Sequence, residues 1–124
     1  MVFAGAADAD NDYLSTVVAE ANDWWFHADK VPGSHVILRA RPDAEPSRET
    51  LKQAASVAAY HSKARNAGIV PVHCTRARHV SKPRGVKTGT VSVERGSTLK
   101  VRPDISFATR LRSAVKSESN NAAK

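Results

Sequence analysis

The residues most suited to chemistry gather around one short bend, where segment 29–34 separates His27 from His35. Two imidazoles suggest a metal site, but the spacing assigns no third ligand, so metal binding is disfavoured. A hydrolase would pair Ser34 with one of these histidines, yet the G-x-S-x-G pattern of a nucleophile elbow is missing. Phosphate binding needs fewer groups than catalysis or metal binding does, because Pro32-Gly33-Ser34 can present backbone N–H groups and a hydroxyl to a phosphate. The bend is therefore interpreted first as a binding site, with catalysis as the alternative.

An aromatic run at residues 24–28 precedes the bend and alternates like a half-buried strand. Trp24 and Phe26 share one face and are expected in the core. Trp25 and His27 share the other face, where either ring is able to stack on a base or a ribose. The run therefore divides into a core face and a candidate binding face.

Basic side chains are concentrated in the second half of the chain, which carries a net charge of +7 overall. Residues 1–60 hold five Lys or Arg and nine Asp or Glu, whereas residues 61–124 hold 14 and three. Between His61 and Val93 there is no carboxylate. Cations left unneutralised repel one another unless a polyanion binds them, although a solubilising basic face is the alternative. The cations of this stretch are Lys63, Arg65, Arg76, Arg78, Lys82, Arg84 and Lys87.

The elements that position these residues begin with a helix. Acidic residues at 8–12 suit a helix N-terminus, and apolar residues follow at helical spacing. Strands are expected at 24–28 and 35–40, on either side of the bend.

A second helix is expected to begin after Ser47, which is a good N-cap residue. Its alanine-rich face predicts close packing on a sheet, and it should continue past Lys63 and Arg65 to a stop at Gly68. Ser62 and Arg65 would then direct polar groups from the helix end toward one phosphate.

The basic stretch continues with a strand at 69–75, and Arg76 and Arg78 should project from one face if the strand extends that far. Residues 81–89 form a loop interrupted by proline and two glycines, and this loop carries three cations. Alternating segments at 90–94 and 98–102 predict a hairpin. Residues 105–124 are expected to form a short helix and a flexible polar tail, outside a domain formed by residues 1–104.

Strands with two intervening helices indicate an α+β fold: a largely antiparallel sheet of about five to six strands, with two main helices packed on one face. The other face would be free to bind. No apolar run approaches the roughly 20 residues of a membrane span. The single cysteine, Cys74, forms no internal disulfide and is expected in the core. A soluble protein of the reducing cytoplasm is therefore expected.

Four segments carry a more specific signal, and they occur in this order: D-W-W-F-H-A-D-K-V-P-G-S-H-V-I-L, E-T-L-K-Q-A-A-S-V-A-A-Y-H-S-K-A-R, V-P-V-H-C-T-R-A-R-H-V-S-K-P-R-G and G-T-V-S-V. Together with the N-D-Y-L of the first helix, they resemble the NFACT RNA-binding domain (NFACT-R) over roughly residues 2–103. In that family the domain occurs in ribosome-quality-control factors that bind obstructed large ribosomal subunits and tRNA, and that promote C-terminal tailing of stalled chains.

The resemblance implies a non-catalytic RNA-binding module for structured RNA such as tRNA or rRNA, with the large ribosomal subunit as a further partner. No cofactor, metal or membrane partner is expected, since the histidine spacing assigns no third ligand and no apolar run is long enough to span a membrane. The sequence lacks the glycosylase-like domain, helix-hairpin-helix region and coiled coil of the large factors, so a stand-alone form is expected and tailing is not carried over. Nothing in the charge pattern separates RNA from DNA. Two alternatives stay open: a small enzyme acting on RNA or nucleotides through His27, Ser34 and His35, or an adaptor docking through Trp24 or Trp25.

The candidate nucleic-acid-binding residues combine the motif positions with the basic stretch. The motif positions are His27, Pro32, Gly33, Ser34, His35, Ser62, Lys63, Arg65 and Lys82. The remaining candidates are Arg39, Arg76, Arg78, Arg84 and Lys87.

Overall fold

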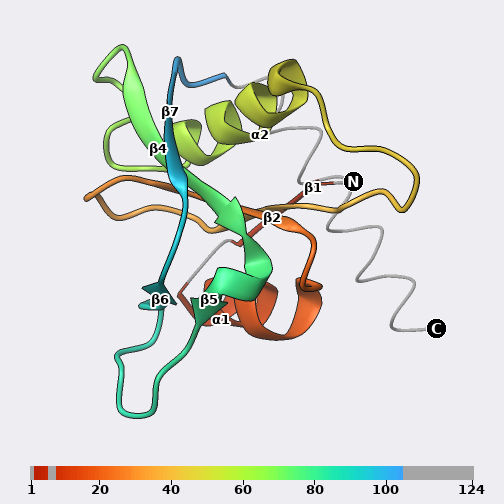
Figure 1. The fold of residues 1–124 in the computed structure, drawn as a ribbon. Helices are drawn as coiled ribbons and strands as arrows, with labels where there is room; N and C mark the ends of the chain where they lie inside the picture. Colours follow the sequence, from red (N-terminus) through yellow and green to blue (C-terminus); the bar gives the residue numbers. More distant parts are fainter. Residues whose placement is uncertain (1, 6–7, 105–124) are drawn as a thin grey trace, which may run out of the picture.

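The computed structural model describes residues 2–5 and 8–104, and these form an α+β fold around a five-stranded antiparallel sheet (Figure 1). The sheet order is β1-β3-β2-β4-β7, and β5 and β6 pair in a small second sheet. This confirms the expected class. The strands are β1 (Val2–Ala4), β2 (Trp24–Ala28), β3 (Val36–Leu38), β4 (Val70–Arg76), β5 (Val80–Ser81), β6 (Ser92–Val93) and β7 (Ser97–Val101). The helical elements are α1 (Asp8–Tyr13), a π-helical turn η1 (Leu14–Val18), α2 (Arg48–Tyr60) and a 3₁₀ turn η2 (Ala77–His79).

Helix α2 covers one face of the sheet with its alanine-rich side. Ser47 caps the helix as predicted, its Oγ accepting the Thr50 N–H at 3.1 Å. The buried alanines pack on a core that includes Phe26 and Val72, both fully shielded from solvent. Small side chains let the helix lie close to the strands, so the middle of this face is buried.

Helix α1 and the η1 turn lie across the opposite face of the sheet (Figure 1). There Leu14 packs with Phe3, Trp25 and Ile37 in a second buried cluster. The prediction that both helices share one face is therefore wrong. Successive strand residues point to opposite faces, so a strand with apolar residues at adjacent positions, such as Val36–Leu38, needs cover on both.

Helix α2 ends at Tyr60, not beyond Arg65 as predicted. The Ser62 Oγ donates to the Ala59 carbonyl at 2.7 Å and accepts the Ala64 N–H at 3.1 Å, which replaces the next helical turn. Ser62 also pairs with Gly33 in an isolated antiparallel bridge. The helix therefore ends where Ser62 contacts Gly33 of the bend, which is remote in the sequence.

The predicted hairpin of residues 90–94 with 98–102 does not form. Strand β7 pairs with β4, while β6 pairs with β5. The chain crosses between the sheets at Gly96, where an added Cβ would lie 2.7 Å from the Cys74 carbonyl oxygen. Arg78 lies in η2, beyond the end of β4, so it does not share a strand face with Arg76. The helix expected after Pro103 falls outside the described residues.

No helix within residues 2–5 and 8–104 is long and apolar enough to cross a membrane.

Candidate nucleic-acid interface

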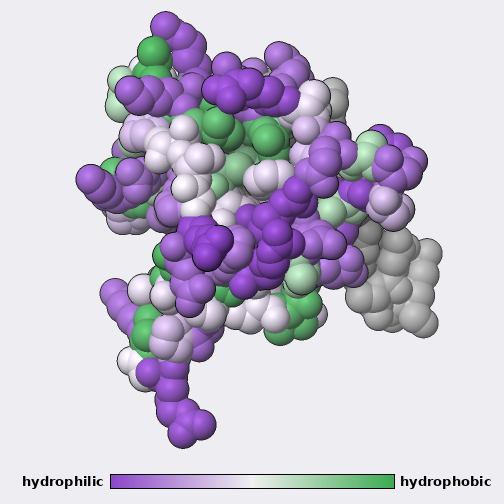
Figure 2. Space-filling model, viewed as in Figure 1, coloured by the Kyte–Doolittle hydropathy of each residue, from purple (hydrophilic) through white to green (hydrophobic). Residues whose placement is uncertain are grey.

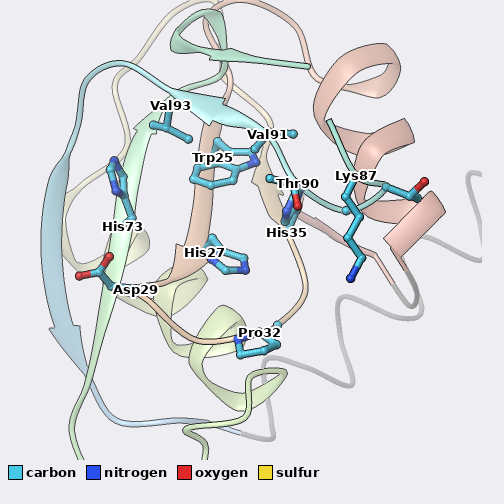
Figure 3. Close-up of a pocket in the computed structure, with 13 residues that line it drawn as sticks. Trp25, His27, Asp29, Pro32, His35, His73, Lys87, Thr90, Val91 and Val93 are labelled. Carbon is cyan, nitrogen blue, oxygen red and sulfur yellow. The ribbon is translucent and has the colours of Figure 1, made fainter. Parts of the chain in front are cut away.

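A pocket of about 450 Å³ opens on the sheet face that carries Trp25 and His27 (Figure 3). The bend after β2 forms one wall and the segment 87–93 forms another. Figure 3 shows the His27 imidazole in the middle of the labelled side chains. The pocket falls within the size range of ligand sites, about 300–1,000 Å³. Its lining is Trp25, His27, Asp29, Pro32, Gly33, His35, His73, Lys87, Thr88, Gly89, Thr90, Val91 and Val93.

The floor of the pocket is fixed by buried hydrogen bonds. The Trp25 indole N–H donates to the Ser15 Oγ at 2.9 Å, and that hydroxyl is 2.8 Å from the His35 Nδ1. The Asn11 Oδ1 accepts the His35 backbone N–H at 3.0 Å. Trp25 and His35 are almost completely buried, with exposed fractions of 3% and 2%. Residues of α1 and η1 therefore hold the two rings in place.

His27 and His73 form the accessible part of the sheet surface in the pocket. They are directly paired across β2 and β4, so their side chains share one face. The Trp25 ring centroid lies 5.9 Å from that of His27, nearly parallel, and 6.1 Å from that of His73, edge-on. Burial lowers the pKa of His27, and backbone hydrogen bonds to Gly33 and Ala28 oppose the shift. The His27 imidazole is therefore neutral at neutral pH.

The bend is tied to the end of α2 by backbone contacts. The Lys63 N–H donates to the Pro32 carbonyl at 2.9 Å, and the Ser34 N–H donates to the His61 carbonyl at 3.3 Å. An added Cβ at Gly33 would lie 3.0 Å from the Ser62 Cα, so the backbones approach as closely as glycine permits. The helix end and the pocket wall thus form one unit.

The loop between β5 and β6 is tied to α1 by one ion pair and one hydrogen bond. The Lys82 Nζ lies 3.3 Å from the Asp12 Oδ2, and that oxygen accepts the Gly89 N–H at 3.0 Å. Lys82 also donates to the carbonyls of Lys87 and Thr90. The hydrogen bond from the Gly89 N–H is the largest cause that lowers the pKa of Asp12, and the Lys82 ammonium lowers it further. Lys82 therefore organises the loop from within.

The candidate cations fall into two groups. Lys63, Arg65, Arg84 and Lys87 are exposed, and no described carboxylate pairs with any of them. Lys87 lines the pocket, and the backbone of Lys63 contacts Pro32 at its edge. Arg84 belongs to the loop that projects from the body in Figure 1 and is hydrophilic at its tip in Figure 2.

Other candidate cations are engaged within the fold. Arg39 donates to the buried Asp23 carboxylate at 2.7 Å. Arg76 is ion-paired with Glu45, and its guanidinium carbon lies 3.9 Å from the Trp24 ring centroid. None of these side chains lines the pocket.

Arg78 and Ser62, the two candidates that remain, are also held by local hydrogen bonds. Arg78 donates to the Asn22 side-chain oxygen at 2.7 Å. Ser62 is 8% exposed, and its hydroxyl is occupied by the helix end described above. Neither one lines the pocket, so the structure does not bring them to the bend's binding face.

Nucleophilic chemistry gains no support from this arrangement. The hydroxyl bonded to His35 belongs to the buried Ser15, and Ser34 contacts the helix end through its backbone. Burial raises the pKa of the Cys74 thiol to about 12, which suits a core residue. Within the described part of the chain, no three His, Cys, Asp or Glu residues are grouped to hold a metal ion.

Sequence reasoning left several lining residues out of the candidate set. His73 had a usable signal, since alternation in a strand with buried Val72 and Cys74 places it on the opposite face. Asp29 had one as well, because it opens the bend directly after β2. Val91 and Val93 had none, because only the pairing of β6 with β5 brings their segment over the sheet.

Comparisons with known proteins identify relatives of the whole described unit. Residues 1–95 match the sequence profile of the NFACT protein RNA binding domain. The Rqc2 homolog RqcH of Bacillus subtilis (strain 168) is 40% identical over 111 residues, 90% of this chain but 19% of that protein. The Streptococcus suis (strain 05ZYH33) protein of the same name is 39% identical over 103 residues, 83% of this chain and 18% of its own length. The solved C-terminal part of the fibronectin/fibrinogen-binding protein from Streptococcus suis (FBPS) has a TM-score of 0.79 at 36% identity, covering 88% of this chain and 43% of that chain. This chain thus spans about a fifth of the length of these curated relatives.

Proposed function

The chain belongs to the NFACT protein RNA binding domain family, and on this premise we propose that residues 1–104 are a non-catalytic module for structured RNA such as tRNA or rRNA. The observation that carries the proposal is a set of four exposed cations that have no described carboxylate partner, together with an aromatic pocket that one of them lines. Lys63, Arg65, Arg84 and Lys87 belong to the pocket's lining, to the helix end beside it or to the projecting loop. Cations of this kind release counterions when they contact phosphates, which drives binding to nucleic acid.

The pocket supports RNA over a featureless polyanion. A surface that binds a polyanion through charge alone does not need a pocket lined by aromatic side chains. The unpaired bases of RNA, by contrast, stack on aromatic and imidazole rings. His27 and His73 offer such rings on one sheet face. Structured RNA presents both a dense phosphate backbone and unstacked bases in its loops and ends.

We infer a role in ribosome-associated quality control in the cytoplasm, and the relatives named Rqc2 homolog RqcH support the quality-control part of this proposal. In this proposal the RNA is tRNA or the rRNA of the large ribosomal subunit. Because the chain spans about a fifth of the length of those relatives, the proposal assigns only RNA contacts to it.

Titration of labelled tRNA at several salt concentrations tests the proposal. Four phosphate contacts predict a slope of log K against log salt of about −3.6. A DNA hairpin of matched length and charge is the control for RNA preference. Failure of tRNA and rRNA fragments to bind even at low salt would contradict the proposal.

A further inference from the structure

We propose that the pocket receives the base of one unpaired nucleotide, and that Asp29 accepts a hydrogen bond from the exocyclic amino group of that base. This inference rests on the proposed RNA-binding function. It names the part of the RNA that enters the pocket and the class of base that it prefers.

The shape of the pocket fits a flat ring. Its floor is the Trp25 and His35 pair, held by the hydrogen bonds to Ser15. His27 and His73 lie side by side next to this floor. Val91 and Val93, which pack against the cluster that contains Trp25, line the pocket from the segment across it. A base that enters would contact imidazole faces on the sheet side and methyl groups on the other. Extruded bases are held in this way, between rings and apolar side chains.

The charges inside the pocket favour a base over a phosphate. Among the described residues that line it there is no arginine, and Lys87 is the single lysine. Asp29 contributes a carboxylate, which would repel a phosphate placed beside it. Burial lowers the pKa of His27, so its ring enters as a neutral, stacking group and not as a cation.

The polar groups lie on opposite sides of the pocket. Figure 3 shows Asp29 and His73 on one side of His27, and Lys87 and Thr90 on the other. No other described side chain bonds to the Asp29 carboxylate, so its acceptors are available. Lys87 likewise has no carboxylate partner among the residues that the structure describes. This arrangement orients a nucleotide with its base edge toward Asp29 and its phosphate toward Lys87.

The chemistry of the bases then sets a preference. Ionised carboxylates accept hydrogen bonds and donate none. Adenine, cytosine and guanine carry an exocyclic amino group, whereas uracil presents carbonyl oxygens at the equivalent edge. Uracil offers the carboxylate only its N3–H, which lies between two carbonyl oxygens that repel a carboxylate, so it should bind more weakly than an amino-bearing base.

The test uses one RNA hairpin that carries a single bulged nucleotide, made as A, C, G, U or an abasic residue. The full chain is titrated with each hairpin at one salt concentration. The abasic hairpin keeps every phosphate, and we expect it to bind at least about fivefold more weakly than the A hairpin, because base stacking is lost. We expect the U hairpin to bind about tenfold more weakly than the best amino-bearing base. Equal affinity for all five hairpins would overturn the proposal, and this comparison needs no variant that has to fold.

Two variants assign the effect to the pocket. Asp29→Asn gains an amide that can donate to uracil, so the preference against U should fall to within about twofold while the abasic deficit remains. Lys52→Ala, an exposed lysine on α2, is the control and should leave the base preference unchanged. If the Asp29→Asn variant discriminates against the U hairpin as strongly as the parent does, the proposed role of the carboxylate is contradicted. If the five hairpins and tRNA all fail to bind, the RNA-binding function fails; if tRNA binds and the hairpins do not differ, only the pocket assignment fails.

Discussion

Lys82 and Lys87 lie five residues apart in one basic loop, and the structure predicts that replacing them with alanine has opposite consequences. Lys87 is exposed and unpaired, so Lys87→Ala removes a phosphate contact and leaves the fold intact. Lys82 is bonded to Asp12 and to two loop carbonyls, so Lys82→Ala loosens the loop. Charge removal is the same in both variants.

The expected sizes follow from the contacts. Each phosphate contact contributes about 0.9 to the salt slope, or about 3.5-fold in affinity for a fourfold rise in salt. Four contacts predict a loss of about 150-fold between about 50 and about 200 mM salt, and Lys87→Ala should reduce that loss to about 40-fold. Lys82→Ala should cost about 1–2 kcal/mol of unfolding free energy, since it deletes charged hydrogen bonds of a partly exposed group.

The assay pairs fluorescence titration of tRNA at four or more salt concentrations with urea unfolding of each variant. Lys52→Ala serves as the charge-matched control, with parental stability and a parental slope. The reasoning is refuted if Lys82→Ala lowers the salt slope at unchanged stability while Lys87→Ala leaves the slope as it was. That result would mean that Lys82 is free to reach phosphate and Lys87 is not.

Three further outcomes test the architecture around the site. Burial lowers the pKa of His27, so the unfolded chain binds more protons than the folded one just below about pH 6.5, and stability should fall as the pH falls through that range. His27→Gln should lose this part of the pH dependence in urea unfolding, and an identical pH profile would contradict the assignment. Gly33→Ala should separate the bend from the helix end, because its Cβ would meet the Ser62 backbone at 3.0 Å. We expect a loss of about 1–3 kcal/mol together with weaker tRNA binding, and Lys52→Ala as the control should retain both. Asp23→Ala should cost about 3 kcal/mol or more by thermal or urea unfolding, since it leaves Arg39 without its buried partner; a cost below about 1 kcal/mol would show that the pair is dispensable.

Local signals in the sequence predicted the elements well. Ser47 is followed by an alanine-rich segment, and the helix begins there because the serine oxygen satisfies a free N–H of the first turn. Alternation at residues 24–28 separated Phe26, in the core with α2, from Trp25 and His27 on the other face. Such periodic patterns depend only on neighbours along the chain.

These local signals could not identify ion-pair partners and strand partners that are far apart in the sequence. Arg39 and Lys82 looked like free cations, but Asp23 and Asp12 reach them only once the strands and the loop are assembled. The strand partners of residues 92–93 and 97–101 were mistaken for the same reason, because adjacent strands suggest a hairpin and only the tertiary fold separates them. The bend was therefore predicted as a binding site without segment 87–93, which lines the pocket beside it.

The most direct test of the central claim is a titration of ¹⁵N-labelled protein with tRNA, followed by NMR. If RNA binds on the pocket face, resonances should shift at the Trp25 indole, the bend around Gly33, Lys63 and the loop segment 84–90. The exposed face of α2 around Lys52 should stay unchanged. Shifts confined to α2, with the pocket and loop resonances unmoved at saturation, would contradict the account.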